Sequence, residues 1–589
     1  MLCNKYPVHW TPPIAEAAFP MTNTMIAGKD APLEFTIASM QEKLAARGFH
    51  IEERSWLNPI EGVWSVHIAD SDCPLLFTNG KGASKLAALA SALGEFCERL
   101  STNYFWNHYY LGEEIAAGEC VHYPQERWFP LGDSEAWPGE LLTPELQTFY
   151  NPEGTVAASA LVDFNSGAAA RGICALPYQR QRDGASVWFP VNIIGNLYVS
   201  NGMSAGNTPA EARTQALSEI VERYVKFRVI AEGLCLPDVP EEVLAEHPAI
   251  AAGIAALRAA GFGVLVKDAS LGGRYPVMNV TLLNPRDQGC FVSFGAHPLW
   301  QVALERALTE LLQGRALAAL DGFPAPGHDL DEVASAPNLE IHFVDSSGIV
   351  HWRFLHDTPD FDYCDWNFPG STREDEAWLV DRLHAEGHDI YIADFTHCGV
   401  YACRILVPGV SEIYAVDDLE WENNSIGNLL REDILNLAEL DDEACAELLD
   451  TLNELDLAEE RPVAALIGVA ADPATLWADL RLGELKLLLA LAAGDSEATR
   501  EGCHWVRHFG QIDSERLRIY RCIETLLALD DPTPYDAALL GLYGESTLDD
   551  AFALLDGEQR FFNLPSPGLQ LAGCDLHQRL LATYAKAHV

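Results

Sequence analysis

The chain has 589 residues, 49% of them hydrophobic and 21% charged, which is the composition of an ordinary soluble globular protein with roughly two to four domains. Its formal net charge of −48 argues against nucleic acid and anionic membrane as main partners, because either would repel such a surface. A basic protein is a compatible partner, although the acidity could also serve solubility alone. No apolar run is long enough to span a membrane, and residues 1–20 lack the apolar core of a signal peptide, so we expect a cytoplasmic protein.

The 14 cysteines are scattered singly and form no Cys-x-x-Cys pair. The sequence therefore offers no case for a zinc ribbon or an iron–sulfur cluster, and scattered thiols fit a reducing compartment. The nearest cluster, His397-Cys398 with Cys403, is better explained as one end of a buried strand than as a set of metal ligands.

Helices and strands are predicted to follow one another through the first part of the chain. Apolar residues at helical spacing predict a helix over 33–47, and strands are expected at 62–69 and 75–78. The loop 79–84 then leads into a second helix, for which Ser84 is placed as the N-cap.

Residues 104–186 are rich in Trp, Pro and Gly, which predicts loops and β-hairpins without an evident chemical role. The segment 188–200 is expected to be a strand that feeds a glycine turn. In the helix that follows, Thr208 is the predicted N-cap, Pro209 takes the first position, and Glu211 completes a capping box three residues after the cap. Capping alone could account for Glu211.

Further strands and a third long helix, opened by His297-Pro298, complete an α/β or α+β body with mixed sheets. The strands are predicted at 264–268, 275–283, 290–294, 341–344, 389–394 and 400–407.

The sequence predicts a tail at 1–20, the α/β body at 21–437 and an all-helical domain at 438–589. Beyond Leu435 the chain becomes rich in Leu, Ala, Asp and Glu. Two similar segments there end in Leu-Ala-Leu triplets at Leu491 and Leu529, 38 residues apart. This period predicts tetratricopeptide-like helix pairs, and a plain helical bundle is the alternative.

The pattern with most chemical content lies in the helix that starts at Pro209. Glu211, Gln215, Glu219 and Glu222 are spaced four, four and three residues apart, so they share one helix face. Carboxylates aligned in this way repel one another unless a cation lies between them. The spacing therefore predicts a divalent metal site.

The same pattern occurs in two other predicted helices. Glu95, Glu98 and Arg99 match Glu219, Glu222 and Arg223 at a constant offset of 124 residues. A weaker third copy places Glu310 where the second helix has Glu219 and Gln313 where it has Glu222. Three glutamate helices could thus converge on one site, with Arg99, Arg223 and Arg306 beside the carboxylates. Solvated glutamate faces paired to arginine are the alternative reading.

Two common motifs give weaker signals. No Walker-type phosphate loop is present, and Gly80-Lys81-Gly82 lacks the third glycine of a dinucleotide turn. Gly202-Met-Ser204-Ala-Gly206 has the Gly-x-Ser-x-Gly form of a serine hydrolase, but in a nucleophile elbow the helix starts directly after the serine. Here the helix is predicted to start several residues later, so this alternative is disfavoured.

Taken together, the three helices resemble the three-part ATP-binding signature of the YcaO superfamily. The signature runs Ser91-x₃-Glu95-x₂-Glu98-Arg99, then Ser204-x₆-Glu211-x₃-Gln215-x₃-Glu219-x₂-Glu222-Arg223, then Arg306-x₃-Glu310. The resemblance implies a YcaO-type body that binds ATP with Mg²⁺. The implied metal ligands are Glu95, Glu98, Glu219, Glu222 and Glu310. The implied ATP contacts are Lys29, Thr36, Ser91, Arg99, Ser204, Asn207, Glu211, Gln215, Arg223 and Arg306, where Thr36 stands in place of the family's serine.

The helical domain makes the chain similar to the bacterial member described as an accessory factor for methylthiolation of an aspartate in ribosomal protein S12. This implies S12 or its methylthiotransferase as a partner, and a homodimer formed through the C-terminal helices. Relatives that modify peptides phosphorylate a backbone amide oxygen, so a cyclodehydratase or thioamide-forming enzyme is an alternative. Such enzymes commonly end in Pro-x-Pro-x-Pro, which the terminal residues 582–589 lack. A non-enzymatic ATP-binding interaction module is the alternative from a different class.

Overall fold

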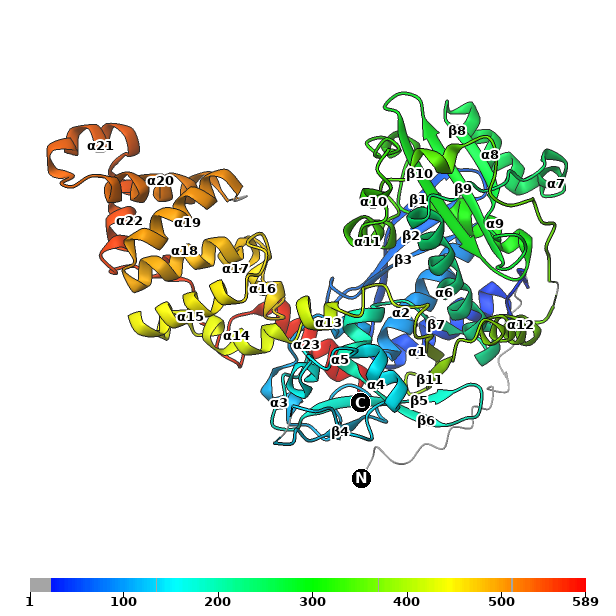
Figure 1. Ribbon diagram of the computed structural model, residues 1–589, viewed down its shortest axis with the longest axis horizontal. Coiled ribbons are helices and arrows are strands. Elements are labelled where there is room, and N and C mark those ends of the chain that lie inside the picture. The colour runs from blue at the N-terminus through cyan, green and yellow to red at the C-terminus, as the bar shows by residue number, and fades with distance from the viewer. Residues whose placement is uncertain (1–22, 134, 369, 510–511, 589) are drawn as a thin grey trace.

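A computed structural model describes residues 23–588, apart from 134, 369, 510 and 511 (Figure 1). The predicted tail at 1–20 lies outside the described residues. A body of sheets and helices is followed by a helical arm that projects to one side of it (Figure 1). Within the described residues no helix is both long and apolar enough to cross a bilayer.

Two units of the body have the same order of elements: a helix, an antiparallel sheet of three strands, and a second helix. The first unit consists of α1 (Leu33–Ala46), β1 (Ile51–Ile60), β2 (Val63–Asp70), β3 (Phe77–Gly82) and α2 (Lys85–Ser101). The second unit consists of α8 (Pro248–Ala259), β8 (Gly263–Asp268), β9 (Val277–Asn284), β10 (Gly289–Ala296) and α9 (Trp300–Leu311).

A third sheet lies beneath these units and carries the long helix α6 (Pro209–Ala231), which follows directly on β7. Its strands run in the order β4-β5-β11-β12-β7, with β6 paired to β5, and these pairings are antiparallel. They are β4 (Arg127–Phe129), β5 (Ile173–Arg180), β6 (Ser186–Pro190), β7 (Met203–Gly206), β11 (Tyr391–Phe395) and β12 (Tyr401–Leu406).

Close packing between each strand and the helix after it fixes where the glutamate helices lie. A Cβ atom on Gly80 of β3 would lie 2.0 Å from the carbonyl oxygen of Ala88 in α2. A Cβ on Gly295 of β10 would lie 2.3 Å from the carbonyl oxygen of Ala303 in α9. Only glycine allows this approach of a helix backbone to a strand. The two helices are thereby held flat against their own sheets.

The arm consists of helices, as the composition predicted. The two similar segments are α18 and α20, with α19 between them, so they are alternate helices of one stack. The tetratricopeptide-like assignment and the boundary at residue 438 stay predictions. The main helices are α14 (Ile426–Leu435), α15 (Asp442–Glu454), α18 (Leu482–Ala493), α19 (Ser496–Phe509), α20 (Ser514–Ala528), α21 (Asp536–Tyr543) and α22 (Glu545–Leu555).

The last helix, α23 (Asp575–Ala587), leaves the arm and returns to the body (Figure 1). Leu580 and Tyr584 are buried in one hydrophobic cluster with residues of α1 and α2. The indole of Trp106 donates a hydrogen bond to the carbonyl of Leu580 at 3.3 Å. The core of the body is therefore completed by residues from the end of the chain.

Further helices, most of them short, connect these elements. They are α3 (Gly112–Ala116), α4 (Pro144–Tyr150), α5 (Val191–Ile193), α7 (Glu241–Ala245), α10 (Leu330–Val333), α11 (Ala336–Val344), α12 (Thr372–Ala385), α13 (Asp418–Trp421), α16 (Val463–Leu466) and α17 (Leu476–Asp479).

Three local predictions were wrong. The apolar run 341–344 belongs to helix α11, where Ile341 and Val344 are exposed, because a short run of this kind fits either structure. The predicted strand 188–200 ends at Pro190 and continues as helix through Tyr198, since the segment is buried on all sides. Residues 79–82, expected in a loop, form the end of β3.

Candidate functional site

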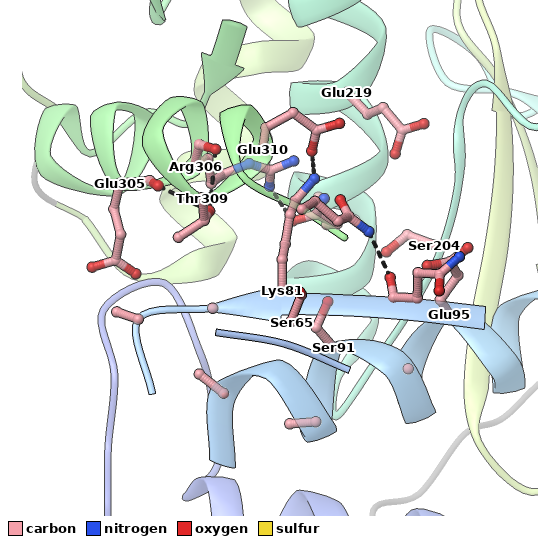
Figure 2. A pocket seen from close by; sticks show the side chains of 18 of the residues that line it. Ser65, Lys81, Ser91, Glu95, Ser204, Glu219, Glu305, Arg306, Thr309 and Glu310 are labelled. Carbon is pink, nitrogen blue, oxygen red and sulfur yellow. Dashed lines mark hydrogen bonds and ion pairs between the residues drawn. The ribbon is translucent and has the colours of Figure 1, made fainter. Parts of the chain in front are cut away.

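The faces of α2, α6 and α9 that carry the glutamates surround one cavity of about 1410 Å³. Figure 2 shows side chains from all three helices and from β3 pointing toward one another in this space. All the predicted site residues except Glu222 line it. The lining members are Lys29, Thr36, Ser91, Glu95, Glu98, Arg99, Ser204, Asn207, Glu211, Gln215, Glu219, Arg223, Arg306 and Glu310.

The repeat seen in the sequence is also a repeat in geometry. Arg99 donates to Glu95 at 3.0 Å in α2, and Arg223 donates to Glu219 at 2.8 Å in α6. Burial raises the pKa of Glu95. Burial together with the charges of Glu219 and Glu95 raises the pKa of Glu98 well above its usual value, although Arg99 opposes this shift. Such a crowd of carboxylates in one cavity is a favourable environment for a divalent cation.

Lys81 is a cavity residue that the sequence analysis missed as a functional group. Its ammonium contacts the carboxylate of Glu310 across the cavity (Figure 2). Burial, followed by the charge of Arg306, lowers the pKa of Lys81 to about 8, while three nearby glutamates act in the opposite sense. Strand geometry could have identified Lys81, because successive side chains of a strand point to opposite faces. Gly80 faces α2, so Lys81 must face the other side.

Glu222 lies behind the cavity wall. Its carboxylate accepts a hydrogen bond from the backbone N–H of Ala296 at 3.0 Å and lies 3.8 Å from the guanidinium of Arg306. Arg306 also donates to the side-chain carbonyl of Gln215. In this arrangement Glu222 ties the end of β10 and Arg306 to α6, and its role as a metal ligand stays a prediction.

Residues 24–32, here called the strap, close one side of the cavity through Glu211. The Glu211 carboxylate accepts from the backbone N–H of Asp30 at 2.9 Å and from the amide of Asn207 at 3.0 Å, and Lys29 lies 3.5 Å away. The Thr36 hydroxyl donates to the Asn207 side-chain oxygen at 3.1 Å.

The predicted capping box at the start of α6 is only half formed. Thr208 does cap α6, and its hydroxyl accepts from the N–H of Glu211 at 3.1 Å. The buried Glu211 side chain instead accepts hydrogen bonds from the strap and from Asn207, which compete with the cap for its carboxylate. The prediction that Glu211 returns to the cap was therefore wrong.

The position of Ser204 does not fit a hydrolase. Ser204 lies inside strand β7 and is 1% exposed, and α6 begins only at Pro209. In a nucleophile elbow the serine stands on the turn between strand and helix. Its hydroxyl is 3.5 Å from the carbonyl oxygen of the adjacent Ala205. Ser204 is therefore a polar group in the floor of the cavity.

The arginines of the site carry unused donors. Arg99 Nε, Arg223 Nη1 and Arg306 Nε are buried and have no hydrogen-bond partner among the described residues. A buried donor without a partner costs about 1–3 kcal/mol, so each of these groups requires an explanation, such as a bound water, an ion or a ligand. Carboxylates for a metal and guanidinium groups for an anion thus occur in one cavity, which fits a metal-bound phosphate.

Comparison with known proteins agrees with this chemistry. Residues 79–411 match the family model described as YcaO cyclodehydratase, ATP- and Mg²⁺-binding, and residues 427–589 match its C-terminal domain. The ribosomal protein S12 methylthiotransferase accessory factor YcaO of Escherichia coli is 50% identical over 96% of this chain and 98% of its own length. An uncharacterised protein of Haemophilus influenzae is 48% identical over the same shares.

Solved structures give a more distant likeness. A heterocyclase in complex with substrate and cofactor has a TM-score of 0.45 and 18% identity, covering 68% of this chain and 56% of its own. YcaO of Methanopyrus kandleri, bound with AMPPCP and Mg²⁺, has a TM-score of 0.41 and 17% identity, covering 66% and 95%. With the family-model match and the long alignment to the Escherichia coli protein, the conclusion follows that this chain belongs to the YcaO family of ATP- and Mg²⁺-binding proteins.

Proposed function

We propose that this protein is an ATP- and Mg²⁺-dependent accessory factor in the β-methylthiolation of an aspartate of ribosomal protein S12. The observation that carries the ATP site is the convergence of three glutamate helices and three arginines with unused donors on one cavity. The 50% identical relative over nearly the whole chain supports the cellular role.

In this proposal each group of residues has a distinct task. The carboxylates would hold Mg²⁺ and are Glu95, Glu98, Glu219, Glu222 and Glu310. The nucleotide would contact Lys29, Thr36, Ser91, Arg99, Ser204, Asn207, Glu211, Gln215, Arg223 and Arg306. Bound ATP would supply a phosphoryl group that activates a peptide amide or another group of a protein substrate. The guanidinium groups would stabilise negative charge in the cavity.

The partners follow from charge and from the arm. A net charge of −48 suits a basic ribosomal protein, and we place the protein in the cytoplasm with the S12 methylthiotransferase as its second partner. We also propose a homodimer formed through the C-terminal helices, because apolar side chains gather unburied at the end of the arm. They are Tyr535, Leu540, Leu542 and Phe552.

The cellular role is tested by mass spectrometry of S12 from cells that lack this protein and carry a plasmid copy. Wild type and Glu305→Gln should restore methylthiolation, and Glu219→Gln should not. Glu305 lines the same cavity but points away from the glutamate cluster (Figure 2), which makes it a matched control. Full methylthiolation with a well-expressed Glu219→Gln variant would contradict the proposal.

The dimer is tested by light scattering after size-exclusion chromatography. Leu542, which is 74% exposed on α21, is changed to Asp, and Leu429, equally exposed on α14, is changed to Asp as the control. We expect Leu542→Asp to be a monomer and Leu429→Asp to keep the wild-type mass. A wild-type protein that is monomeric throughout would refute the dimer.

A peptide cyclodehydratase or thioamide-forming activity remains the second candidate, since the family model is described as a cyclodehydratase. The discriminating measurement is the mass of candidate peptides after incubation with ATP, Mg²⁺ and the protein, with and without added sulfide as the sulfur source. Loss of water, or exchange of oxygen for sulfur, in the peptide would favour this candidate. Binding of ATP without any turnover would favour a non-enzymatic module.

A further inference from the structure

Three buried side chains of ligand type lie outside the ATP cavity, where the loop before β4 meets β5. His122 precedes β4, Asp163 follows the short helix at Ala158–Leu161, and Cys174 is in β5. They are 3%, 1% and 0% exposed. Their potential ligand atoms all lie within 4.8 Å of one another. Segments far apart in the sequence thus bring a nitrogen, an oxygen and a sulfur together.

The distances are close to those of a tetrahedral metal site. His122 Nε2 and Asp163 Oδ2 are 3.1 Å apart. Glu126 adds a second carboxylate, whose Oε2 is 3.8 Å from Cys174 Sγ. Around a tetrahedral zinc ion with bonds of about 2.0–2.3 Å, neighbouring ligand atoms are roughly 3.3–3.8 Å apart. Three donors therefore lie within 4.8 Å of one another with Glu126 beside the thiol, and side-chain shifts are needed to bring all four to metal-ligand separation.

Both carboxylates are held in place by hydrogen bonds from outside the cluster. Asp163 accepts from the backbone N–H of Ser166 at 2.7 Å and from its hydroxyl. Glu126 accepts from the backbone N–H of Val121 at 2.8 Å and from the indole of Trp128 at 2.9 Å. Contacts of this kind orient the ligands of metal sites, because they fix the oxygen that faces the ion.

Two arrangements without a metal can be compared with this site. A catalytic Cys-His-Asp triad would need a reachable thiol, but Cys174 is fully buried, and burial with the charges of Glu126 and Asp163 raises the pKa of that thiol well above its usual value. A buried pair of His122 with Asp163, together with a hydrogen bond from the Cys174 thiol to Glu126, satisfies these groups in the metal-free protein. A divalent cation would in addition explain why a thiol, an imidazole and carboxylates meet at one buried point, since it converts the thiol to a thiolate and offsets the carboxylate charges.

We propose that His122, Asp163 and Cys174, with Glu126 as the fourth ligand, form a closed site for Zn²⁺ or a similar divalent transition metal ion. Thiolate and imidazole ligands favour such an ion over Mg²⁺. Binding releases the Cys174 thiol proton to solvent, and His122 Nε2 must also give up the proton that it shares with Asp163, so that His122 binds as a neutral imidazole. Because the protein supplies all four ligands, the ion has a structural role.

The metal site would stabilise the position of α23 against the body. His588, directly after α23, donates a ring N–H to the carbonyl of His122 at 3.2 Å. The ion would join the loop before β4 to β5 and to the segment at Asp163, so that this carbonyl stays in position. The inference does not depend on the proposed function.

The experiment uses the full-length protein, made metal-free and then loaded with Co²⁺, in the Glu219→Gln background so that the glutamate cavity binds less metal. We expect a thiolate-to-cobalt charge-transfer band in the near ultraviolet and roughly one tightly held ion per chain. The band should vanish in Cys174→Ala and His122→Ala. It should persist in Cys522→Ala, which removes an equally buried cysteine from α20 in the arm.

Thermal unfolding gives a second readout. Removal of metal by a strong chelator should lower the midpoint temperature of unfolding of the parent protein and of Cys522→Ala. The midpoint temperature of Cys174→Ala should not change. Absence of the thiolate band in the Co²⁺-loaded parent protein would overturn the proposal. This outcome does not depend on whether the variants at the site fold. Persistence of the band in a folded Cys174→Ala variant would overturn it equally.

Discussion

At the scale of single residues, Glu211 acts mainly through the strap that it holds. Replacement by Ala leaves two donors, the Asp30 N–H and the Asn207 amide, without their carboxylate acceptor. We expect Glu211→Ala to lower the free energy of unfolding by about 1–3 kcal/mol and to expose the strap to proteases. Glu211→Gln keeps an acceptor oxygen and should therefore lose less stability than Glu211→Ala. Urea unfolding and limited proteolysis measure both effects; an Ala variant as stable and as resistant as wild type would show that the strap is held otherwise.

His577 in α23 should make the protein less stable in acid. Its ring accepts from the N–H of Ala470 at 2.9 Å and donates to the carbonyl of Tyr110 at 2.8 Å. Burial lowers its pKa from 6.5 to about 4 in the folded state. Below pH 6.5 the unfolded chain therefore binds a proton that the folded protein excludes, and stability falls toward pH 4.

The expected size of this effect follows from the two pKa values. Between about pH 7.5 and pH 5, His577 should remove about 2 kcal/mol of stability, and His577→Gln should lack this part of the loss. Urea unfolding at both pH values measures it, with His504→Gln on the exposed side of α19 as the control. If the two variants lose equal stability on acidification, the buried imidazole is not responsible.

At the scale of elements, α23 belongs to the core of the body although it is the last helix of the chain. Leu580 is fully buried against α1 and α2. Leu580→Ala should cost about 2–5 kcal/mol of stability by leaving a cavity. Leu429→Ala, at a position that is 74% exposed, should change stability by less than about 0.5 kcal/mol. Equal stabilities would mean that α23 is not needed by the body, and a fragment cut at residue 438 would then fold.

The sequence predicted those elements whose signal was local. The caps at Ser84 and Thr208 and the strands of the second unit were confirmed. Capping residues and β-rich runs depend only on residues that are close in sequence, so the sequence shows them directly. Strand β1 was missed, since half of its side chains are polar and exposed, and it lies along an edge of its sheet. The return of α23 could not be seen, because it depends on contacts between residues hundreds of positions apart.

The site was also predicted unevenly. The glutamates were found because a spacing of three and four repeats in helices, and the structure brings all of them except Glu222 to one cavity. Lys81 was missed as a functional residue because a lone lysine in a strand carries no such period. The cluster of His122, Asp163 and Cys174 was invisible for another reason: its members come from separate segments, so no motif joins them.

At the scale of the whole molecule, two units of the same construction lie directly against each other, with α9 beside β2 and β3, and each contributes one glutamate helix to the shared cavity. Seven carboxylates line the cavity against six lysine and arginine side chains, so its formal charge is nearly balanced. The carboxylates are Glu95, Glu98, Glu211, Glu219, Glu305, Glu310 and Asp345, and the cations are Lys29, Lys81, Arg99, Arg223, Arg306 and Arg315. A metal ion among the glutamates and an anion among the arginines keep this balance, so nucleotide and Mg²⁺ are expected to bind together, each improving the affinity for the other.

The most direct test is calorimetric titration of ATP into the full-length protein with and without Mg²⁺. We predict that Mg²⁺ strengthens ATP binding to wild type and to the control Glu305→Gln, and that Glu219→Gln loses at least about tenfold in affinity in the presence of Mg²⁺ because a metal ligand is gone. ATP affinity that is the same with and without Mg²⁺ in wild type, or unchanged in a folded Glu219→Gln variant, would contradict the account.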